Sequence, residues 1–428
     1  MNAQPAIISD RSCRSSIQFL EALTATYRQK DFAVRFWDGT LWGDIHGPRF
    51  TLVLKHPGAL RSMLMSPNEL TLGEAFIYDD FDIEGDIEAA FGFADFLLDR
   101  DYSIIEKLKL GGMIATLPTA DNRSSRAQGA DLKGKVHSKE RDRNAVSYHY
   151  DISNDFYALW LDSSMVYSCA YFKSAEDDLD TAQARKLDYI CKKLRLRPGE
   201  RMLDLGCGWG GLLMHAVKNY GVEAFGITLS TAQAKLARER IHLAGLEDRC
   251  KVEVRDYRDL DPSQRYDKIV SVGMFEHVGE KLLPEYFRRA WEALRPGGVF
   301  LNHGIASSAT VQGRGPSFTE KYVFPDGELV PVSSTLRAAE TCGFEVRDVE
   351  SLREHYALTL RHWVHRLEEK ADEARKIAGE VAYRIWRLYM SGSVHGFKTG
   401  RISVYQVLLS KPDHGDCQLP LTREDWYS

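Results

Sequence analysis

A short apolar segment followed by a glycine-rich turn is the first feature of this chain that could support chemistry. It runs Met202-Leu-Asp-Leu-Gly-Cys-Gly-Trp-Gly-Gly-Leu212, and apolar residues recur at helical spacing directly afterwards. A strand, a glycine turn and a helix start form a platform for a nucleotide. Asp204 precedes Gly206, Gly208 and Gly210, which differs from the G-x-G-x-x-G dinucleotide fingerprint, and no phosphate-binding lysine follows. The turn therefore favours a nucleoside that carries an amino acid, such as S-adenosylmethionine (SAM).

Polar side chains follow the next two predicted strands. In an open parallel sheet, ligands bind beyond the carboxyl ends of the strands. Thr228, Ser230 and Gln233 come after the second strand, where they could hold the ribose and the amino-acid part of the ligand. Ser230 is also a candidate helix cap. Asp256 and Tyr257 come after the third strand and suit the amino group and ring face of adenine, with a solvated charged loop as the alternative.

A carboxylate and two imidazoles stand at the ends of the fourth and fifth predicted strands. Glu276 and His277 are adjacent, and His303 lies near the end of the fifth strand. Such groups at neighbouring strand ends indicate acid–base chemistry. Metal coordination by these three residues lacks the H-x-x-x-H or C-x-x-C spacing, so no metal site is predicted.

The elements that must position these residues alternate between strand and helix from about residue 185 onward. This alternation predicts an α/β fold with a parallel sheet covered by helices on both faces. A helical stretch at 357–391 before the last strand is a candidate lid. We expect strands at 201–205, 223–229, 250–255, 267–273, 298–305, 344–350 and 401–410, and helices at 210–219, 230–244 and 283–294.

The first part of the chain has a different organisation. Strand patterns at 32–37, 41–42 and 50–54 surround an Asp-Gly turn signal, and helical patterns follow at 87–98 and 102–117. Residues 118–144 carry more basic than acidic side chains, typical of a solvated tether or of a segment attracted to anionic headgroups. The predicted division is an N-terminal domain at 1–120, a linker at 121–144 and a catalytic domain at 145–428.

Bulk properties narrow the class of protein. At 428 residues the chain is longer than one ordinary domain. A net charge of −5 argues against nucleic acid as the main partner. Seven cysteines without paired spacing indicate a reducing compartment. Neither a secretion signal nor a run of about 18 apolar residues is visible, so we expect a cytoplasmic protein that would meet a lipid from the water side.

Four motifs together resemble those of cyclopropane-fatty-acyl-phospholipid synthases, which are related to the mycolic acid cyclopropane synthases. They are Asp204-Leu-Gly-Cys-Gly-Trp-Gly-Gly, Met274-Phe-Glu-His-Val-Gly, Met165-Val-Tyr-Ser-Cys-Ala-Tyr-Phe172 and Glu320-Lys-Tyr-Val-Phe-Pro325. The resemblance covers roughly 145–410 and is weaker before 120. It implies a class I SAM-dependent methyltransferase fold, Rossmann-like, with a mostly parallel seven-stranded sheet and a smaller α+β N-terminal domain for lipid docking.

The same resemblance implies the reaction and its residues. A methylene unit from SAM would be added to the cis double bond of unsaturated acyl chains in membrane phospholipids to form a cyclopropane ring, with peripheral association at the inner membrane face. A bicarbonate ion would be held by the backbone of Cys169 and by Glu276, His303, Ile305 and Tyr356, the last match having unusual flanking residues. The implied SAM contacts are Tyr167, Ser168, Gly206, Gly208, Thr228, Ser230, Gln233, Asp256 and Tyr257.

Three alternatives stay open at this point. The same fold could make a methyl- or methylene-branched acyl chain, could methylate a small amine, or could serve as an inactive SAM- or lipid-binding regulator. The N-terminal segment 72–82 resembles a family motif but has Tyr78-Asp79-Asp80 where an Asp-Gly pair is usual. The sequence leaves open the acyl length, double-bond position, headgroup and oligomeric state, a homodimer included.

Overall fold

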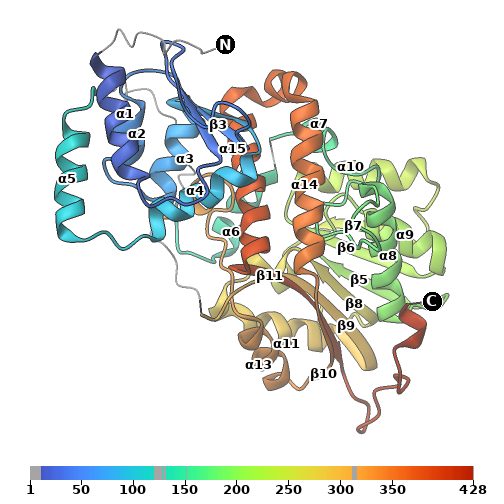
Figure 1. The fold of residues 1–428 in the computed structure, drawn as a ribbon. Coiled ribbons are helices and arrows are strands. Elements are labelled where there is room, and N and C mark those ends of the chain that lie inside the picture. Colours follow the sequence, from blue (N-terminus) through green and yellow to red (C-terminus); the bar gives the residue numbers. More distant parts are fainter. Residues whose placement is uncertain (1–10, 120–128, 130–131, 151, 311–315, 428) are drawn as a thin grey trace. The chain divides into compact units, whose positions relative to one another are not determined.

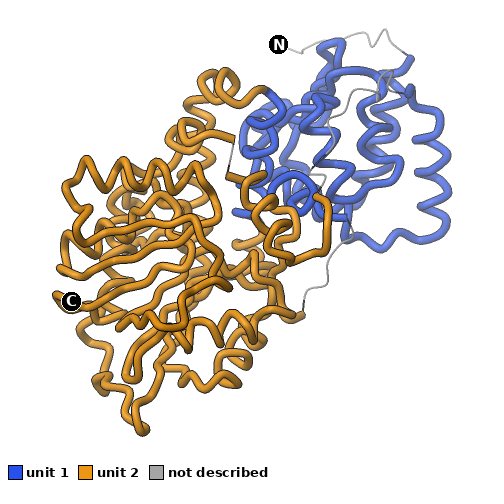
Figure 2. The backbone as a smooth tube through the Cα atoms, turned by 180° about the vertical axis from the view of Figure 1, so that it is seen from behind, with its two compact units in different colours: residues 1–129, 312–323, 380–395 blue, residues 130–311, 324–379, 396–428 orange. Residues whose placement is uncertain are grey.

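The structure is a computed structural model that describes residues 11–119, 129, 132–150, 152–310 and 316–427. The chain forms two compact units (Figure 2), and we describe each by itself. The N-terminal unit comprises Met1–Gly129, Gln312–Val323 and Glu380–His395, and the larger unit comprises Ala130–Val311, Phe324–Gly379 and Gly396–Ser428.

The larger unit is built on one sheet with the order β10-β11-β9-β8-β5-β6-β7 among its described strands (Figure 1). Neighbouring strands are parallel except that β11 runs antiparallel to both β9 and β10. The predicted mostly parallel, seven-stranded α/β sheet is therefore confirmed. The strands are β5 (Arg201–Leu205), β6 (Glu223–Thr228), β7 (Cys250–Val254), β8 (Tyr266–Val272), β9 (Leu294–Ser307), β10 (Glu345–Ser351) and β11 (Ile402–Ser410).

Helices bury both faces of this sheet, which explains the nearly continuous apolar character of its strands. Successive residues of β5 enter opposite cores, Met202 with α8, α9 and α10, and Leu203 with α11 and α13. The side chain of Asp204 lies on the same face as Met202 because strand side chains alternate. The helices of this unit are α6 (Lys139–Tyr150), α7 (Asn154–Ala158), α8 (Leu179–Leu194), α9 (Gly211–Tyr220), α10 (Thr231–Leu243), α11 (Leu283–Ala293), α13 (Val332–Thr341), α14 (Arg353–Glu369) and the two ends of α15 (Ala371–Thr399).

The N-terminal unit contains a second sheet with the order β2-β1-β3-β4 among the residues described. The predicted hairpin at Asp38-Gly39 joins β1 to β2, and Gly39 has a φ of 85° as such a turn requires. The strands are β1 (Phe32–Arg35), β2 (Leu41–Gly43), β3 (Phe50–Leu54) and β4 (Phe81–Gly85). The helices are α1 (Arg11–Leu23), α2 (Ala59–Leu64), α3 (Glu69–Ile77), α4 (Ile87–Asp99), α5 (Ile104–Ala115), α12 (Phe318–Tyr322) and the middle of α15.

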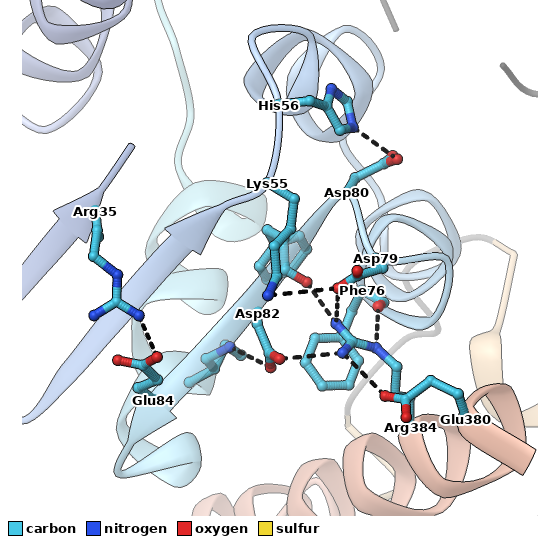
Figure 3. Close-up of polar contacts among 12 residues, drawn as sticks. Arg35, Lys55, His56, Phe76, Asp79, Asp80, Asp82, Glu84, Glu380 and Arg384 are labelled. Carbon is cyan, nitrogen blue, oxygen red and sulfur yellow. Dashed lines mark hydrogen bonds and ion pairs between the residues drawn. The ribbon is translucent and has the colours of Figure 1, made fainter. Parts of the chain in front are cut away.

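A buried arginine holds the middle of α15 within the N-terminal unit (Figure 3). The Nε and Nη2 atoms of Arg384 each donate a 2.8 Å hydrogen bond, to the carbonyls of Phe76 and Phe81 respectively. Its guanidinium also forms 3.1 Å ion pairs with Asp79 and Asp82. Only 5% of the Arg384 side chain is exposed, so these partners are required to offset its desolvation.

Asp79 accounts for the departure of the 72–82 segment from the usual Asp-Gly pair. Its φ is 61°, a left-handed conformation that glycine adopts freely and that aspartate tolerates better than most residues. The carboxylate of Asp79 forms the ion pair with Arg384 and a 3.9 Å contact with Lys55 (Figure 3).

The helices of the structure cross two ranges that the sequence analysis set apart, the linker and the lid. Residues 121–128, 130 and 131 of the predicted linker lie outside the described residues. Its last part, 139–144, belongs to helix α6, in which Asp142 is buried and pairs with Arg258. The predicted 357–391 stretch is helical but is not one segment. Gly379, with a φ of 85°, breaks α15, and the residues that follow it pack in the N-terminal unit.

Candidate functional site

An open pocket lies at the carboxyl ends of β5, β6, β7 and β8 in the larger unit. Nine of the eleven predicted SAM-binding residues line it: Tyr167, Ser168, Asp204, Gly206, Gly208, Thr228, Gln233, Asp256 and Tyr257. The other two, Gly210 and Ser230, are the N-caps of the helices that begin beside it. The Ser230 hydroxyl accepts a 3.2 Å hydrogen bond from the Gln233 amide, so the predicted capping role is confirmed.

The glycine turn after β5 must be free of side chains. Gly206 has a φ of 104°, and a Cβ built there would lie 2.6 Å from the Cβ of Met274. Gly208 and Gly210 also have positive φ angles, of 53° and 81°. The turn therefore passes close to Met274, which is itself part of the pocket lining.

Helix α8 fixes the polar part of the pocket. The Nζ of Lys186 donates a 2.8 Å hydrogen bond to the hydroxyl of Ser168, and Gln183 donates to the Ser168 carbonyl at 2.9 Å. Burial lowers the pKa of Lys186 to about 8 and raises the pKa of Asp204 to about 7, each opposed by the charge of the other. The Asp204 Oδ1 is buried without a hydrogen-bond partner. An unpartnered acceptor in the pocket lining fits a bound polar ligand.

Asp256 and Tyr257 differ in what they offer a ligand. Arg258 occupies both carboxylate oxygens of Asp256, with Nε to Oδ1 at 2.8 Å and Nη2 to Oδ2 at 2.6 Å, and it also pairs with Asp142 at 2.8 Å. The hydroxyl of Tyr257 is buried without a hydrogen-bond partner. Tyr257 is thus the freer of the two predicted adenine contacts.

Glu276 follows β8, whereas His303 lies inside β9, level with Val272 at the end of β8, so the sequence placed His303 too near the strand end. Glu276 Oε1 accepts a 2.7 Å hydrogen bond from the backbone N–H of Ile305, whereas Oε2 has no partner. Burial raises the pKa of Glu276 to about 7. His303 Nδ1 lies 3.2 Å from Gln406 Nε2, its Nε2 has no partner, and burial holds its pKa well below the ordinary value, so the ring is neutral.

A chain of contacts brings Cys169 and Tyr356 to the same neighbourhood. Ile305 pairs with Val404 of β11, and the Val404 carbonyl accepts a 2.9 Å hydrogen bond from Leu352. The Leu352 carbonyl in turn contacts the Cys169 thiol at 3.7 Å and accepts from the Tyr356 N–H at 3.0 Å. Burial raises the pKa of Cys169 well above its ordinary value, so its sulfur stays a thiol.

The five predicted anion-site residues therefore gather in the larger unit, although none of them lines the pocket itself. The link between the two sites is the short helix η2 (Phe275–His277), because Met274 and His277 line the pocket and Glu276 lies between them. Burial lowers the pKa of His277 to about 4, so this ring is also neutral.

Sequence reasoning missed several residues of the pocket, namely Asp142, Val146, Tyr150, Lys186, Trp209 and Arg258. Lys186 and Gln183 had a usable signal, because two polar residues interrupt the apolar face of a helix. Asp142 had none, because it stands in a charged segment typical of a linker.

Metal binding and membrane spanning find no support in the described part of the chain. No three His, Cys, Asp or Glu side chains in those ranges are arranged to hold a metal ion. None of the helices within them is long and apolar enough to cross a membrane.

The sheet order, the glycine turn and the pocket at the strand ends define a class I SAM-dependent methyltransferase. Comparison with protein families identifies it further. The family model of the mycolic acid cyclopropane synthetases matches residues 137–407, and the chain belongs to this family. A model for a domain of unknown function matches residues 19–94.

Similar proteins agree with this assignment. A "Probable fatty acid methyltransferase" of Pseudomonas putida is 42% identical over 399 residues, covering 92% of this chain and 95% of the relative. The cyclopropane-fatty-acyl-phospholipid synthase of Escherichia coli K12 is 38% identical over 313 residues, 73% and 79% of the two chains. The solved mycolic acid cyclopropane synthase CmaA1, complexed with SAH and CTAB, is 34% identical with a TM-score of 0.60, covering 62% of this chain and 97% of that one. The resemblance seen in the motifs is confirmed.

Proposed function

We propose that this methyltransferase adds a methylene unit from SAM to the cis double bond of unsaturated acyl chains in membrane phospholipids, forming a cyclopropane ring. The observation that carries the proposal is the unpartnered, buried Oε2 of Glu276 next to the SAM pocket. Ring closure requires a group that accepts a proton from the new methyl carbon. The likeness to the E. coli synthase supports the same reaction.

The chemistry sets what the residues must do. The π electrons of the alkene form a C–C bond to the methyl carbon as the S–CH3 bond breaks, leaving S-adenosylhomocysteine and a carbocation. Loss of a proton from the new methyl group then closes the ring. An isolated alkene is a weak nucleophile, so the pocket must align it with the donor and exclude water.

The residues around Glu276 fit a bound bicarbonate ion. The ion would supply the base for ring closure, held by Glu276, His303 and Tyr356 and by the backbone at Cys169 and Ile305. Glu276 has a pKa of about 7 and can hold a proton near neutral pH. Gln406 Nε2 faces Nδ1 of His303, an arrangement that favours the tautomer with its proton on Nε2, from which the ring would donate to an anion.

A second product is favoured by a specific observation. The P. putida relative matches 92% of this chain and is named a fatty acid methyltransferase. A 1,2-hydride shift in the same carbocation, followed by loss of a proton from the new methyl group, would give a methylene-branched acyl chain. A saturated methyl branch would in addition require reduction of that methylene by an external hydride donor such as a reduced nicotinamide cofactor. The ring and the methylene share the SAM pocket and the lipid, and they differ in whether the cation shifts before the methyl group loses its proton.

Lipid analysis tests the proposal. The chain is expressed in a bacterial host whose own cyclopropane synthase gene has been removed, and membrane lipids are measured by mass spectrometry. We expect unsaturated phospholipids to gain one CH2 per modified acyl chain. Chain fragmentation and hydrogen count then separate a ring or methylene from a saturated methyl branch. Unchanged lipids in cells that contain folded protein would refute the proposal.

A further inference from the structure

Helix α5 of the N-terminal unit presents large apolar side chains to solvent. Ile104 and Ile105 are each 78% exposed and Leu108 is 72% exposed. Gly111 and Gly112 continue the same face, because a Cβ at either position would meet nothing within 4 Å. These five residues, the α5 apolar face, occupy one side of the helix at 100° per residue. A contiguous exposed patch of this kind marks an interaction site.

The exposure does not come from a loosely held helix. Ser103 and Glu106 form a capping box at the start of α5, and Arg61 donates hydrogen bonds of 2.7 and 2.9 Å to the carbonyls of Ala115 and Leu117 at its end. Ile114 is buried on the side that contacts α1 and α2. Both ends of the helix are therefore fixed, with its apolar residues turned outward.

The charged side chains around the α5 apolar face indicate which kind of partner it contacts. Lys107 and Lys109 are exposed and flank the α5 apolar face on its two sides. The one acidic residue of the helix, Glu106, accepts hydrogen bonds from Ser103 and pairs with Arg100, so its charge is neutralised within the unit. A surface with an apolar centre, cationic margins and its single carboxylate already paired is typical of a helix that lies in the interface of an anionic bilayer.

We propose that α5 docks the protein on anionic phospholipid membranes, lying flat among the headgroups with the α5 apolar face inserted and both lysines on phosphates. At 1.5 Å per residue its twelve residues span about 18 Å, against about 30 Å of hydrocarbon, so the helix lies on the bilayer. A second copy of the chain is a poorer occupant because it would bring four lysines together. The inference rests on the proposed function, since a lipid substrate requires the protein to visit a membrane.

Vesicle binding without turnover tests the surface alone. The full chain is mixed with vesicles of saturated phosphatidylglycerol and phosphatidylcholine, which offer no double bond, in the absence of SAM, and the bound fraction is measured by flotation. The triple variant I104S/I105S/L108S should bind at least about 30-fold more weakly. The double variant K107Q/K109Q should lose about fivefold per lysine on anionic vesicles and nothing on pure phosphatidylcholine.

Two controls exclude other causes of weaker vesicle binding. One tests whether loss of any exposed apolar side chain has the same effect, and the other tests whether the triple variant is still folded. Leu243 on α10 is 86% exposed, so Leu243→Ser matches the chemical change and should bind vesicles as the unsubstituted chain does. In detergent-dispersed unsaturated phospholipid the triple variant should keep full turnover. Absence of turnover in every variant would refute the proposed function but leave the vesicle result standing.

Two outcomes would overturn the inference. One is equal vesicle binding by the triple variant and the unsubstituted chain. The other is unchanged vesicle binding with a change from dimer to monomer in light scattering, which would assign the α5 apolar face to contact between copies.

Discussion

Replacing Glu276 by glutamine separates binding of the donor from the chemistry. The amide keeps the side-chain shape and an oxygen to accept the 2.7 Å hydrogen bond from Ile305. It replaces the unpartnered Oε2 by an NH2 group that cannot accept a proton. We expect turnover to fall by about 100-fold or more, the usual size of an acid–base contribution. SAM affinity should change little, because Glu276 does not line the pocket.

The same substitution should stabilise the fold, and the size follows from the pKa. Burial raises the pKa of Glu276 from 4.5 to about 7. Between these values the unfolded chain releases a proton that the folded chain keeps, so this group makes stability fall as pH rises through the window. Glutamine does not titrate. Glu276→Gln should therefore raise the free energy of unfolding by about 3 kcal/mol at pH 8 and by little at pH 5.

Three measurements check this reasoning: steady-state methyl transfer, SAM binding by calorimetry, and urea unfolding at pH 5 and pH 8. Glu354→Gln is the matched control, because Glu354 lies in the first turn of α14 with 68% of its side chain exposed, and it should change none of them. Near-normal turnover in Glu276→Gln would refute the proposed anion site. A stability change of equal size at both pH values would show that the carboxyl is not desolvated.

Three further substitutions test the sites in turn. Gly206→Ala places a Cβ 2.6 Å from the Cβ of Met274 at a φ of 104°, so it should lower the free energy of unfolding by about 3 kcal/mol and abolish SAM binding. The control Gly245→Ala, at a φ of 65° in open space, should lower it by about 1 kcal/mol. Burial lowers the pKa of Lys186 from 10.5 to about 8. Above pH 8 the unfolded chain therefore holds a proton that the folded chain has lost. The free energy of unfolding should rise by about 2 kcal/mol between pH 8 and pH 10 because of this group. Lys186→Met should lack that rise and should weaken SAM binding about tenfold by freeing the Ser168 hydroxyl. Arg384→Met leaves two buried carbonyls without their donors and removes one ion pair each from Asp79 and Asp82. It should cost at least about 3 kcal/mol, read as faster proteolysis of the N-terminal unit.

The catalytic fold was predictable because its signals are local and periodic. The strand predicted at 201–205 has those bounds in the structure, and the helices predicted at 210–219 and 230–244 begin one residue later. A glycine turn and a helix cap are set by residues within a few positions of one another. The placement of Glu276 after β8 was predictable in the same way, but His303 lies inside β9, which extends to Ser307 beyond the predicted end.

The structural features that could not be predicted depend on contacts between residues far apart in the sequence. Asp142 is buried in an ion pair with Arg258, a partner 116 positions away in the sequence. Arg384 joins the N-terminal unit through carbonyls more than 300 positions away. A polar residue with a distant partner looks the same in sequence as one exposed to solvent, so the predicted linker and the predicted single lid were both drawn from local pattern alone.

The N-terminal unit consists of three separate segments of the chain, so recombination at a single point cannot exchange it as a whole. The methyltransferase family model spans 137–407, and within it lie two segments, 312–323 and 380–395, that fold with the first part of the chain. A chimera joined near residue 130 would take residues 79 and 82 from a relative but keep Arg384 of this chain. The buried guanidinium would then face whatever side chains the relative has at these two positions. We therefore expect substitutions at these positions to be accepted together. The sequence divides into two ranges matched by different family models, 19–94 and 137–407, but the two compact units of the structure do not follow that division.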